Sequence, residues 1–243
     1  MFERWKKFLI AAAFDPRWTC AVCGRENFGE KYICEECEKK LPFIGENRCA
    51  HCGRPLAAAA PVCDTCRNRL TEIDGCRSVF RYAGAVETLI KKFKYGGGKW
   101  LAEGFAGYLA ALFGESGFEA DAAVSVPMLE KDEKRRGYNQ TKLLAEAFSA
   151  LTGIPAEDPL RKKRLTARQA ALAGKDRLKN LIDAFRVKDK TLTEGKSILI
   201  LDDVTTTGAT LQAVAAALKK GGAKRVYALT IAAVSVGEKT KKS

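Results

Sequence analysis

A pair of aspartates followed by a threonine-rich turn is the part of this chain best equipped for chemistry. Asp202 and Asp203 follow the apolar run Ile198 to Leu201. The turn consists of Thr205, Thr206, Thr207, Gly208, Ala209 and Thr210. A turn leading into a helix presents free backbone N–H groups and the positive end of the helix dipole, which together bind phosphate. Carboxylates repel phosphate but accept hydrogen bonds from sugar hydroxyls. The stretch indicates a site for a ribose 5-phosphate unit. The alternative is a buried strand, a polar turn and a helix without a ligand.

The flanking residues predict the elements that would hold this turn. The run Ile198 to Leu201 has no polar face, which is typical of a central parallel strand covered on both sides. A helix is expected from about Ala209 to Lys220, where two glycines end it. Because the two acids would lie at the strand end and outside the core, we expect replacement of both by asparagine to abolish ligand binding and leave the fold intact.

Eight of the nine cysteines form four Cys-x-x-Cys pairs. They make two units that repeat at an offset of 29 residues, each with Gly-Arg after its second cysteine. In a cytosolic chain this pattern indicates metal and not disulfides. Two structural Zn²⁺ sites in sequential order are predicted, and a crossed pairing is the alternative. His51 is then a bystander, and Cys76 packs as a small apolar residue. The expected ligands are Cys20, Cys23, Cys34 and Cys37, then Cys49, Cys52, Cys63 and Cys66.

The composition limits the classes of partner. The chain has 243 residues, a net charge of +13 and no apolar run of the roughly 20 residues that a membrane helix needs. We therefore expect a cytoplasmic protein without membrane insertion. The charge indicates a polyanionic partner or a phosphate-rich ligand. A solvated surface excess is the alternative.

Strands that alternate with helices predict an α/β fold with a mostly parallel sheet. Helices are expected over 85–95, 100–113 and from residue 140 to about 151. Strands are expected over 78–82, 122–127, 184–187 and 225–234. The predicted domains are a short amphipathic helix over 1–18, a cysteine-rich zinc domain over 19–70, the α/β domain over 71–237 and a disordered basic tail over 238–243.

Two basic stretches are candidates for contacts with phosphate or with single-stranded nucleic acid. One follows the strand over 122–127, and the other lies within 155–180. Tyr138 and Trp100 are candidates for stacking on bases. A solvated surface loop is the alternative for the second stretch. The candidate contact residues are Arg135, Arg136, Tyr138, Asn139, Gln140, Arg164, Arg168, Gln169 and Arg177.

Residues 198–210 resemble the 5-phosphoribosyl-1-pyrophosphate (PRPP) signature of type I phosphoribosyltransferases, which has four apolar residues, two acids and a Thr-Thr-Gly-x-Thr loop. The stretch Arg135 to Gln140, the later pattern of Arg164, Gln169, Arg177 and Asn180, and the paired cysteines resemble the ComF family. This resemblance implies a double zinc ribbon joined to a type I phosphoribosyltransferase-like parallel sheet flanked by helices. It also implies binding of PRPP with Mg²⁺, with a pyrophosphate loop at Val126, Pro127 and Met128.

The same resemblance implies a role in handling single-stranded DNA during natural transformation, beside a helicase-like partner. The alternative is an active phosphoribosyltransferase that transfers phosphoribosyl from PRPP to an unknown acceptor. A third reading is a zinc-ribbon adaptor with a vestigial ligand site. Intact Asp202, Asp203, Gly208 and Thr210 argue against that decay.

Overall fold

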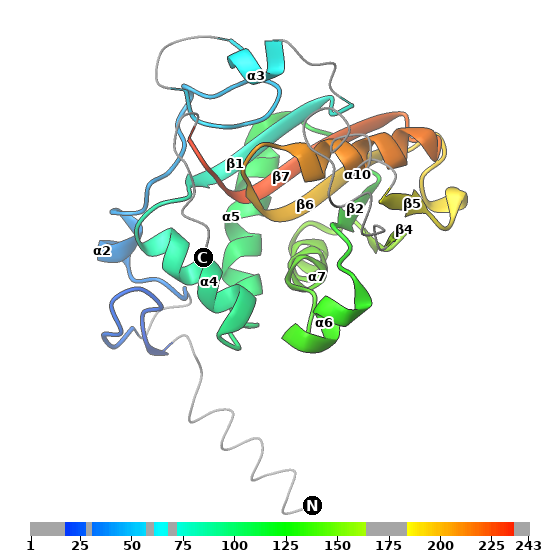
Figure 1. Ribbon diagram of the computed structural model, residues 1–243. Coiled ribbons are helices and arrows are strands. Elements are labelled where there is room, and N and C mark those ends of the chain that lie inside the picture. Colours follow the sequence, from blue (N-terminus) through cyan, green and yellow to red (C-terminus); the bar gives the residue numbers. More distant parts are fainter. Residues whose placement is uncertain (1–17, 28–30, 57–60, 68–71, 164–183, 236–243) are drawn as a thin grey trace, which may run out of the picture.

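A five-stranded parallel sheet forms the centre of the molecule. The computed structural model describes residues 18–27, 31–56, 61–67, 72–163 and 184–235 (Figure 1). Every neighbouring pair of strands in this sheet is parallel, as the alternation of strands and helices predicts. In spatial order the strands are β1 (Gly75–Arg81), β7 (Arg225–Ala233), β6 (Ser197–Thr205), β2 (Ala122–Ser125) and β3 (Ala156–Glu157).

The central strand β6 supplies apolar side chains to both faces of the sheet. Leu199 and Leu201 belong to one buried cluster, whereas Ile198 and Ile200 belong to another. This split follows from the two-residue period of a strand, which turns successive side chains to opposite faces. All four residues are fully buried, so the prediction of a covered central strand is confirmed. Each such side chain contributes about 1.5–3 kcal/mol by leaving water.

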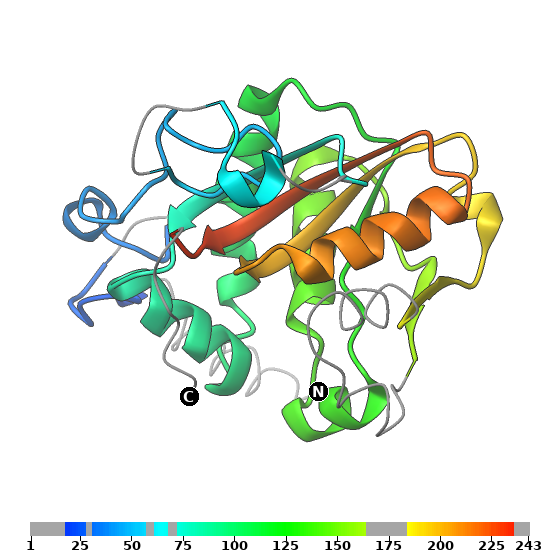
Figure 2. The same ribbon diagram turned by 45° about the horizontal axis from the view of Figure 1, so that its top comes forward.

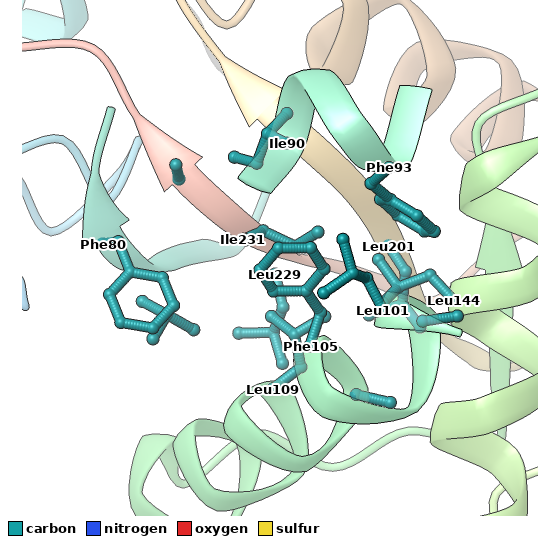
Figure 3. Close-up of a cluster of buried hydrophobic side chains, with 14 of the residues drawn as sticks. Phe80, Ile90, Phe93, Leu101, Phe105, Leu109, Leu144, Leu201, Leu229 and Ile231 are labelled. Atoms are coloured by element: carbon teal, nitrogen blue, oxygen red, sulfur yellow. The ribbon is translucent and has the colours of Figure 1, made fainter. Parts of the chain in front are cut away.

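Helices cover the two faces unequally. The first face packs against α4, α5 and α7, and Figure 3 shows Phe93, Phe105 and Leu144 of these helices gathered with strand residues Leu201 and Leu229. The second face is covered by α10, which lies along the sheet in Figure 2, and by the two-stranded antiparallel sheet of β4 and β5. Their bounds are α4 (Ala85–Tyr95), α5 (Leu101–Ser116), α7 (Gln140–Thr152), α10 (Ala209–Lys220), β4 (Leu160–Lys162) and β5 (Phe185–Val187).

Several element boundaries differ from the sequence prediction. The helices predicted over 85–95 and 209–220 are confirmed. The first strand begins at Gly75 and not at Ser78, because Cys76 packs into the second buried cluster and extends the apolar pattern backwards. The short helix α6 (Glu130–Arg136) and the two-residue strand β3 were not predicted, since neither has an apolar period. Among the described residues, none of the helices combines the length and the apolar character needed to cross a bilayer.

The two cysteine-rich units pack on the α/β domain. Each contains one short helix, α2 (Glu35–Glu38) in the first and α3 (Asp64–Arg67) in the second. The first unit lies against α5, where the Tyr108 hydroxyl donates to Glu38 at 2.7 Å. Its Ile33 and Leu41 belong to the same buried cluster as Val79 and Phe80 of β1. The described part of the N-terminal region therefore shares a hydrophobic core with the sheet.

Candidate functional site

The two aspartates lie within β6, which continues past them to Thr205. Asp202 is 8% exposed and Asp203 is 4% exposed. The expectation that both acids lie outside the core is wrong. Val126 and the loop after β2 lie beside them, because β2 and β6 are parallel and Ser125 pairs with Leu201.

Asp203 is held by two side chains from different helices. The Lys94 Nζ of α4 lies 2.6 Å from one carboxylate oxygen, and the Gln140 Nε2 of α7 donates to the other at 2.6 Å. A buried carboxylate needs such partners, since an unpaired charge is costly away from water. Burial alone would lower the pKa of the Lys94 ammonium, but the facing Asp203 raises it above its ordinary value. Asparagine at position 203 would leave Lys94 unpaired, so the double replacement is not structurally neutral.

Asp202 has a different environment from its neighbour. Its carboxylate accepts the backbone N–H of Asp203 at 2.8 Å. Burial, and then the charge of Asp203, raise the pKa of Asp202 to about 7. Asp202 is thus an acid whose charge changes near neutral pH, at the point where a ligand in the following loop would meet the strand.

The loop after the acids has the features of an anion site. Thr205 is 3% exposed, and its Oγ1 has no hydrogen-bond partner among the residues that the structure describes. Thr206 and Thr207 are exposed, and Gly208 has a φ of 75°, in the left-handed region that glycine favours. A cavity of ≈ 30 Å³ is lined by Asp202 and by residues 204–211. The loop leads into the N-terminus of the twelve-residue helix α10, whose dipole favours an anion.

The residues assigned to a pyrophosphate loop follow β2 directly. Val126 is buried, and its carbonyl oxygen accepts the Thr141 hydroxyl at 2.8 Å. Pro127 and Met128 are half-buried. The structure places this loop next to Asp202, at the carboxyl edge of the sheet where ligands of such folds bind.

Three of the candidate nucleic-acid residues have structural positions instead. Tyr138 is 8% exposed and its hydroxyl donates to the Phe93 carbonyl oxygen. A buried ring offers no open face to a base, so the stacking role is not supported. Asn139 caps α7 by accepting the Thr141 N–H at 3.1 Å, and Gln140 is engaged with Asp203.

The basic candidates divide between the surface and the undescribed part of the chain. Arg135 is exposed on α6, and Arg136 of the same helix is half-buried beside Gln140. The candidates that lie outside the described residues are Arg164, Arg168, Gln169 and Arg177.

Tyr95 was not among the stacking candidates predicted from the sequence. It ends α4 next to Lys94 and is 72% exposed. The Arg136 guanidinium lies 4.8 Å from the centre of its ring. Trp100, the other stacking candidate, is half-buried, and the Lys92 ammonium lies 5.0 Å from its ring centre. In the sequence, Tyr95 lies between the lysines of α4 and three glycines. This position at a helix end is the feature from which its exposure could have been predicted.

Each cysteine-rich unit gathers its own four thiols. Within each unit the four Sγ atoms lie within 4.8 Å of one another. The sequential order is therefore confirmed over the crossed one. In both units a backbone N–H donates to the sulfur of the first cysteine at 3.4 Å, as thiolate ligands require. His51 is exposed and outside both clusters, and Cys76 is fully buried, as predicted. Four converging thiols fit a structural Zn²⁺ ion in each unit.

Two family models match the chain in separate segments. The double zinc ribbon domain matches residues 9–67. The phosphoribosyl transferase domain matches residues 135–243. The first match covers both four-thiol clusters, and the second covers Asp202, Asp203 and the loop.

Three curated relatives share the sequence pattern. Competence protein F of Haemophilus influenzae is 31% identical over 60% of this chain and 66% of its own length. The DNA utilization protein YhgH of Escherichia coli K12 is 36% identical over 44% and 46%. Competence protein ComFC of Bacillus subtilis is 29% identical over 64% and 62%. The chain thus spans between about half and two thirds of these relatives.

Among solved structures, a glutamine PRPP amidotransferase from B. subtilis matches 58% of this chain and 30% of its own, with 19% identity and a TM-score of 0.42. The fold assignment rests instead on the observed parallel sheet and the family models. Together they define a phosphoribosyltransferase-fold protein with an N-terminal double zinc ribbon. With its named competence relatives, the chain is a member of the ComF family.

We expect two zinc ions per chain, because each thiol cluster is complete by itself. Elemental analysis of protein purified without added metal measures this directly. Both units should lose zinc to a strong chelator only with loss of structure, since small units of this kind depend on metal for folding. One zinc per chain, with four thiols open to alkylation in the folded protein, would contradict the assignment.

We expect stability to fall as pH rises toward neutrality because of Asp202. The folded state keeps this proton up to a pKa of about 7, whereas an unfolded aspartate loses it near its ordinary pKa of 3.8. Between these values the unfolded state binds fewer protons, so the free energy of unfolding decreases with pH. Asp202→Asn cannot titrate and should flatten this dependence. Thermal unfolding of both proteins between about pH 5 and about pH 8, with zinc content checked, tests it. Parallel profiles would rule it out.

Proposed function

We propose that this chain binds PRPP with Mg²⁺ at the end of β6 and binds single-stranded DNA beside it, as a competence protein in DNA uptake. The observation that carries the proposal is the loop after Asp202 and Asp203, with its unpartnered Thr205 hydroxyl, left-handed Gly208 and helix N-terminus. The relatives are named for competence and DNA utilization, which supports the DNA part.

In this proposal the loop residues hold the 5-phosphate. The exposed backbone of Thr206 and Thr207 and the N-terminus of α10 would donate to its oxygens. The Thr205 hydroxyl would gain the acceptor that it lacks in the protein alone.

Asp202 is the acid assigned to the ribose. Asp203 is already paired with Lys94, whereas Asp202 accepts the Asp203 backbone N–H and has no ion-pair partner within the described residues. A carboxylate accepts hydrogen bonds from both hydroxyls of a ribose diol. Mg²⁺, which prefers oxygen ligands and phosphates, would be supplied with the pyrophosphate group.

The DNA surface is assigned to the end of α4 and the adjacent α6. Tyr95 offers an exposed ring with the Arg136 guanidinium over it, and Lys92 of α4 places a second positive charge over the Trp100 ring. Aromatic rings with interleaved cations bind single strands through base stacking and phosphate attraction, with little sequence preference. The helicase-like partner remains a prediction, since the described contacts do not test it.

The alternative function is phosphoribosyl transfer to an acceptor. The exposed Tyr95, which directly follows Lys94, the partner of Asp203, favours it, because an acceptor base could stack on this ring. Bond formation at the ribose C1 would then release pyrophosphate, and the chain would need no nucleophile of its own. Lys94 would contribute positive charge near the leaving group. Pyrophosphate release from PRPP in the presence of candidate bases or amines would favour transfer over binding alone.

We expect Asp202→Asn to weaken PRPP binding by about tenfold to a hundredfold, because a charge-assisted hydrogen bond contributes about 1.5–3 kcal/mol. Calorimetric titration with PRPP and Mg²⁺ measures the change. Asp158→Asn is the control, since this exposed acid precedes β4 and forms a surface pair with Lys188, the residue after β5. Equal affinity of Asp202→Asn and wild type would mean that the ribose assignment is wrong.

We expect Tyr95→Ala to weaken single-stranded DNA binding, because stacking on one ring contributes about 1–3 kcal/mol per base. Fluorescence anisotropy with a labelled oligonucleotide, repeated over a range of salt, measures the affinity and its electrostatic part. For a single strand the log–log slope should be about 0.7 per neutralised phosphate. Trp18→Ala is the control, a ring 45% exposed on the first cysteine-rich unit. A salt-independent affinity, or no difference between the two variants, would refute the assigned surface.

A further inference from the structure

One arginine of the second cysteine-rich unit contacts the loop after β6, residues 205–210, which is called the phosphate loop below. Arg54 is 7% exposed, and its Nε donates to the Cys52 sulfur at 3.4 Å while its Nη2 donates to the Cys63 sulfur at 3.7 Å. Its remaining nitrogen, Nη1, donates to the backbone carbonyl oxygen of Thr206 at 3.0 Å. A single buried guanidinium therefore joins two expected zinc ligands to the loop assigned to the ligand.

Within the part of the chain that the structure describes, the matching arginine of the first unit, Arg25, makes no hydrogen bond to the phosphate loop. Arg25 pairs with Glu36 at 2.8 Å, and both side chains are 67% exposed. The two turns are otherwise alike. In each, the N–H of the glycine before the arginine donates to the backbone carbonyl oxygen of the unit's first cysteine at 2.9 Å. The difference between the two arginines arises from what surrounds each unit and not from the repeat itself.

The second unit is also pressed against the sheet. A Cβ atom added to Gly53 would lie 2.8 Å from the Arg77 Cα and 2.9 Å from the Cys76 carbonyl oxygen, whereas one added to Gly24 meets nothing within 4 Å. Arg77 also donates to the Ala50 carbonyl oxygen at 3.1 Å. These contacts fix the turn that carries Arg54 relative to β1, so the guanidinium reaches the loop from a rigid support.

Holding the Thr206 carbonyl has a consequence for the loop backbone. In a trans peptide the C=O and the following N–H point in opposite directions. The bond from Arg54 therefore fixes the direction of the Thr207 N–H, one of the groups that a phosphate in this loop would use. Zinc-bound thiolates at Cys52 and Cys63 would keep negative charge beside the guanidinium and so keep it in place.

We propose that Arg54 is a positioning residue through which the second zinc site holds the phosphate loop in its binding shape. Loss of zinc from the second unit would then make the backbone of the phosphate loop less ordered. Loss of zinc from the first unit would not have this effect through Arg54. The coupling itself stands on the contacts of Arg54. Only the expected effect of Arg54 on PRPP affinity rests on the function proposed above.

The test compares Arg54→Ala with the matched control Arg25→Ala in the full chain. Amide signals of residues 206–208 are followed by NMR without ligand, and PRPP affinity with Mg²⁺ is measured by calorimetry. We expect Arg54→Ala to shift or broaden these signals and to weaken PRPP binding roughly tenfold, while Arg25→Ala leaves both unchanged. Zinc content is measured for each variant.

Unchanged loop signals in Arg54→Ala, with both zinc ions bound and affinity within about twofold of wild type, would overturn the proposal. If that variant loses zinc or fails to fold, Arg54→Lys takes its place. A lysine keeps the charge beside the thiolates but lacks the fork that reaches both sulfurs and Thr206. Unchanged loop signals in that variant would equally overturn it. If the wild-type protein does not bind PRPP but Arg54→Ala still shifts the loop signals, the proposed ligand is wrong. The proposal that Arg54 positions the loop then stands.

Discussion

The ion pair between Lys94 and the buried Asp203 is the interaction on which the rest of the site depends. Asp203 is 4% exposed, and the Lys94 Nζ and the Gln140 Nε2 each lie 2.6 Å from one of its carboxylate oxygens, which supplies the partners that a buried carboxylate needs. These partners come from α4 and α7, and they draw both helices to the carboxyl edge of the sheet. The same pairing gives one of the two acids a cation as its partner, whereas Asp202 accepts the Asp203 backbone N–H. Tyr95, the residue after Lys94, is 72% exposed.

Local patterns in the sequence predicted the parts of the fold that have short-range causes. The apolar run of β6, the helix bounds of α4 and α10, and the grouping of cysteines all depend on neighbouring residues, and all are confirmed. The burial of Tyr138 and the partners of Asp203 depend on contacts between segments far apart in the chain, which spacing does not encode. Tyr138, in a basic motif, is buried, whereas Tyr95, at a helix end, is exposed.

The two cysteine-rich units show how one repeated sequence can serve two structural purposes. Their thiols and turn hydrogen bonds correspond closely, so zinc would stabilise both in the same way. The first unit packs on α5 and contributes to the main hydrophobic core. The second lies on β1 and reaches the phosphate loop through Arg54. The N-terminal region therefore covers part of the sheet and also contacts the loop after β6, so a double zinc ribbon joined to a phosphoribosyltransferase fold has a physical reason to be one unit.

The central claim is that the end of β6 and its loop form a phosphoribosyl site. A crystal structure of the protein with PRPP and Mg²⁺ tests it most directly. The account predicts the 5-phosphate within reach of the Thr205 hydroxyl and the backbone of residues 206–209, with the ribose hydroxyls beside Asp202 and the Lys94–Asp203 pair intact. Density for the ligand at another surface, with this loop empty under saturating PRPP, would contradict it.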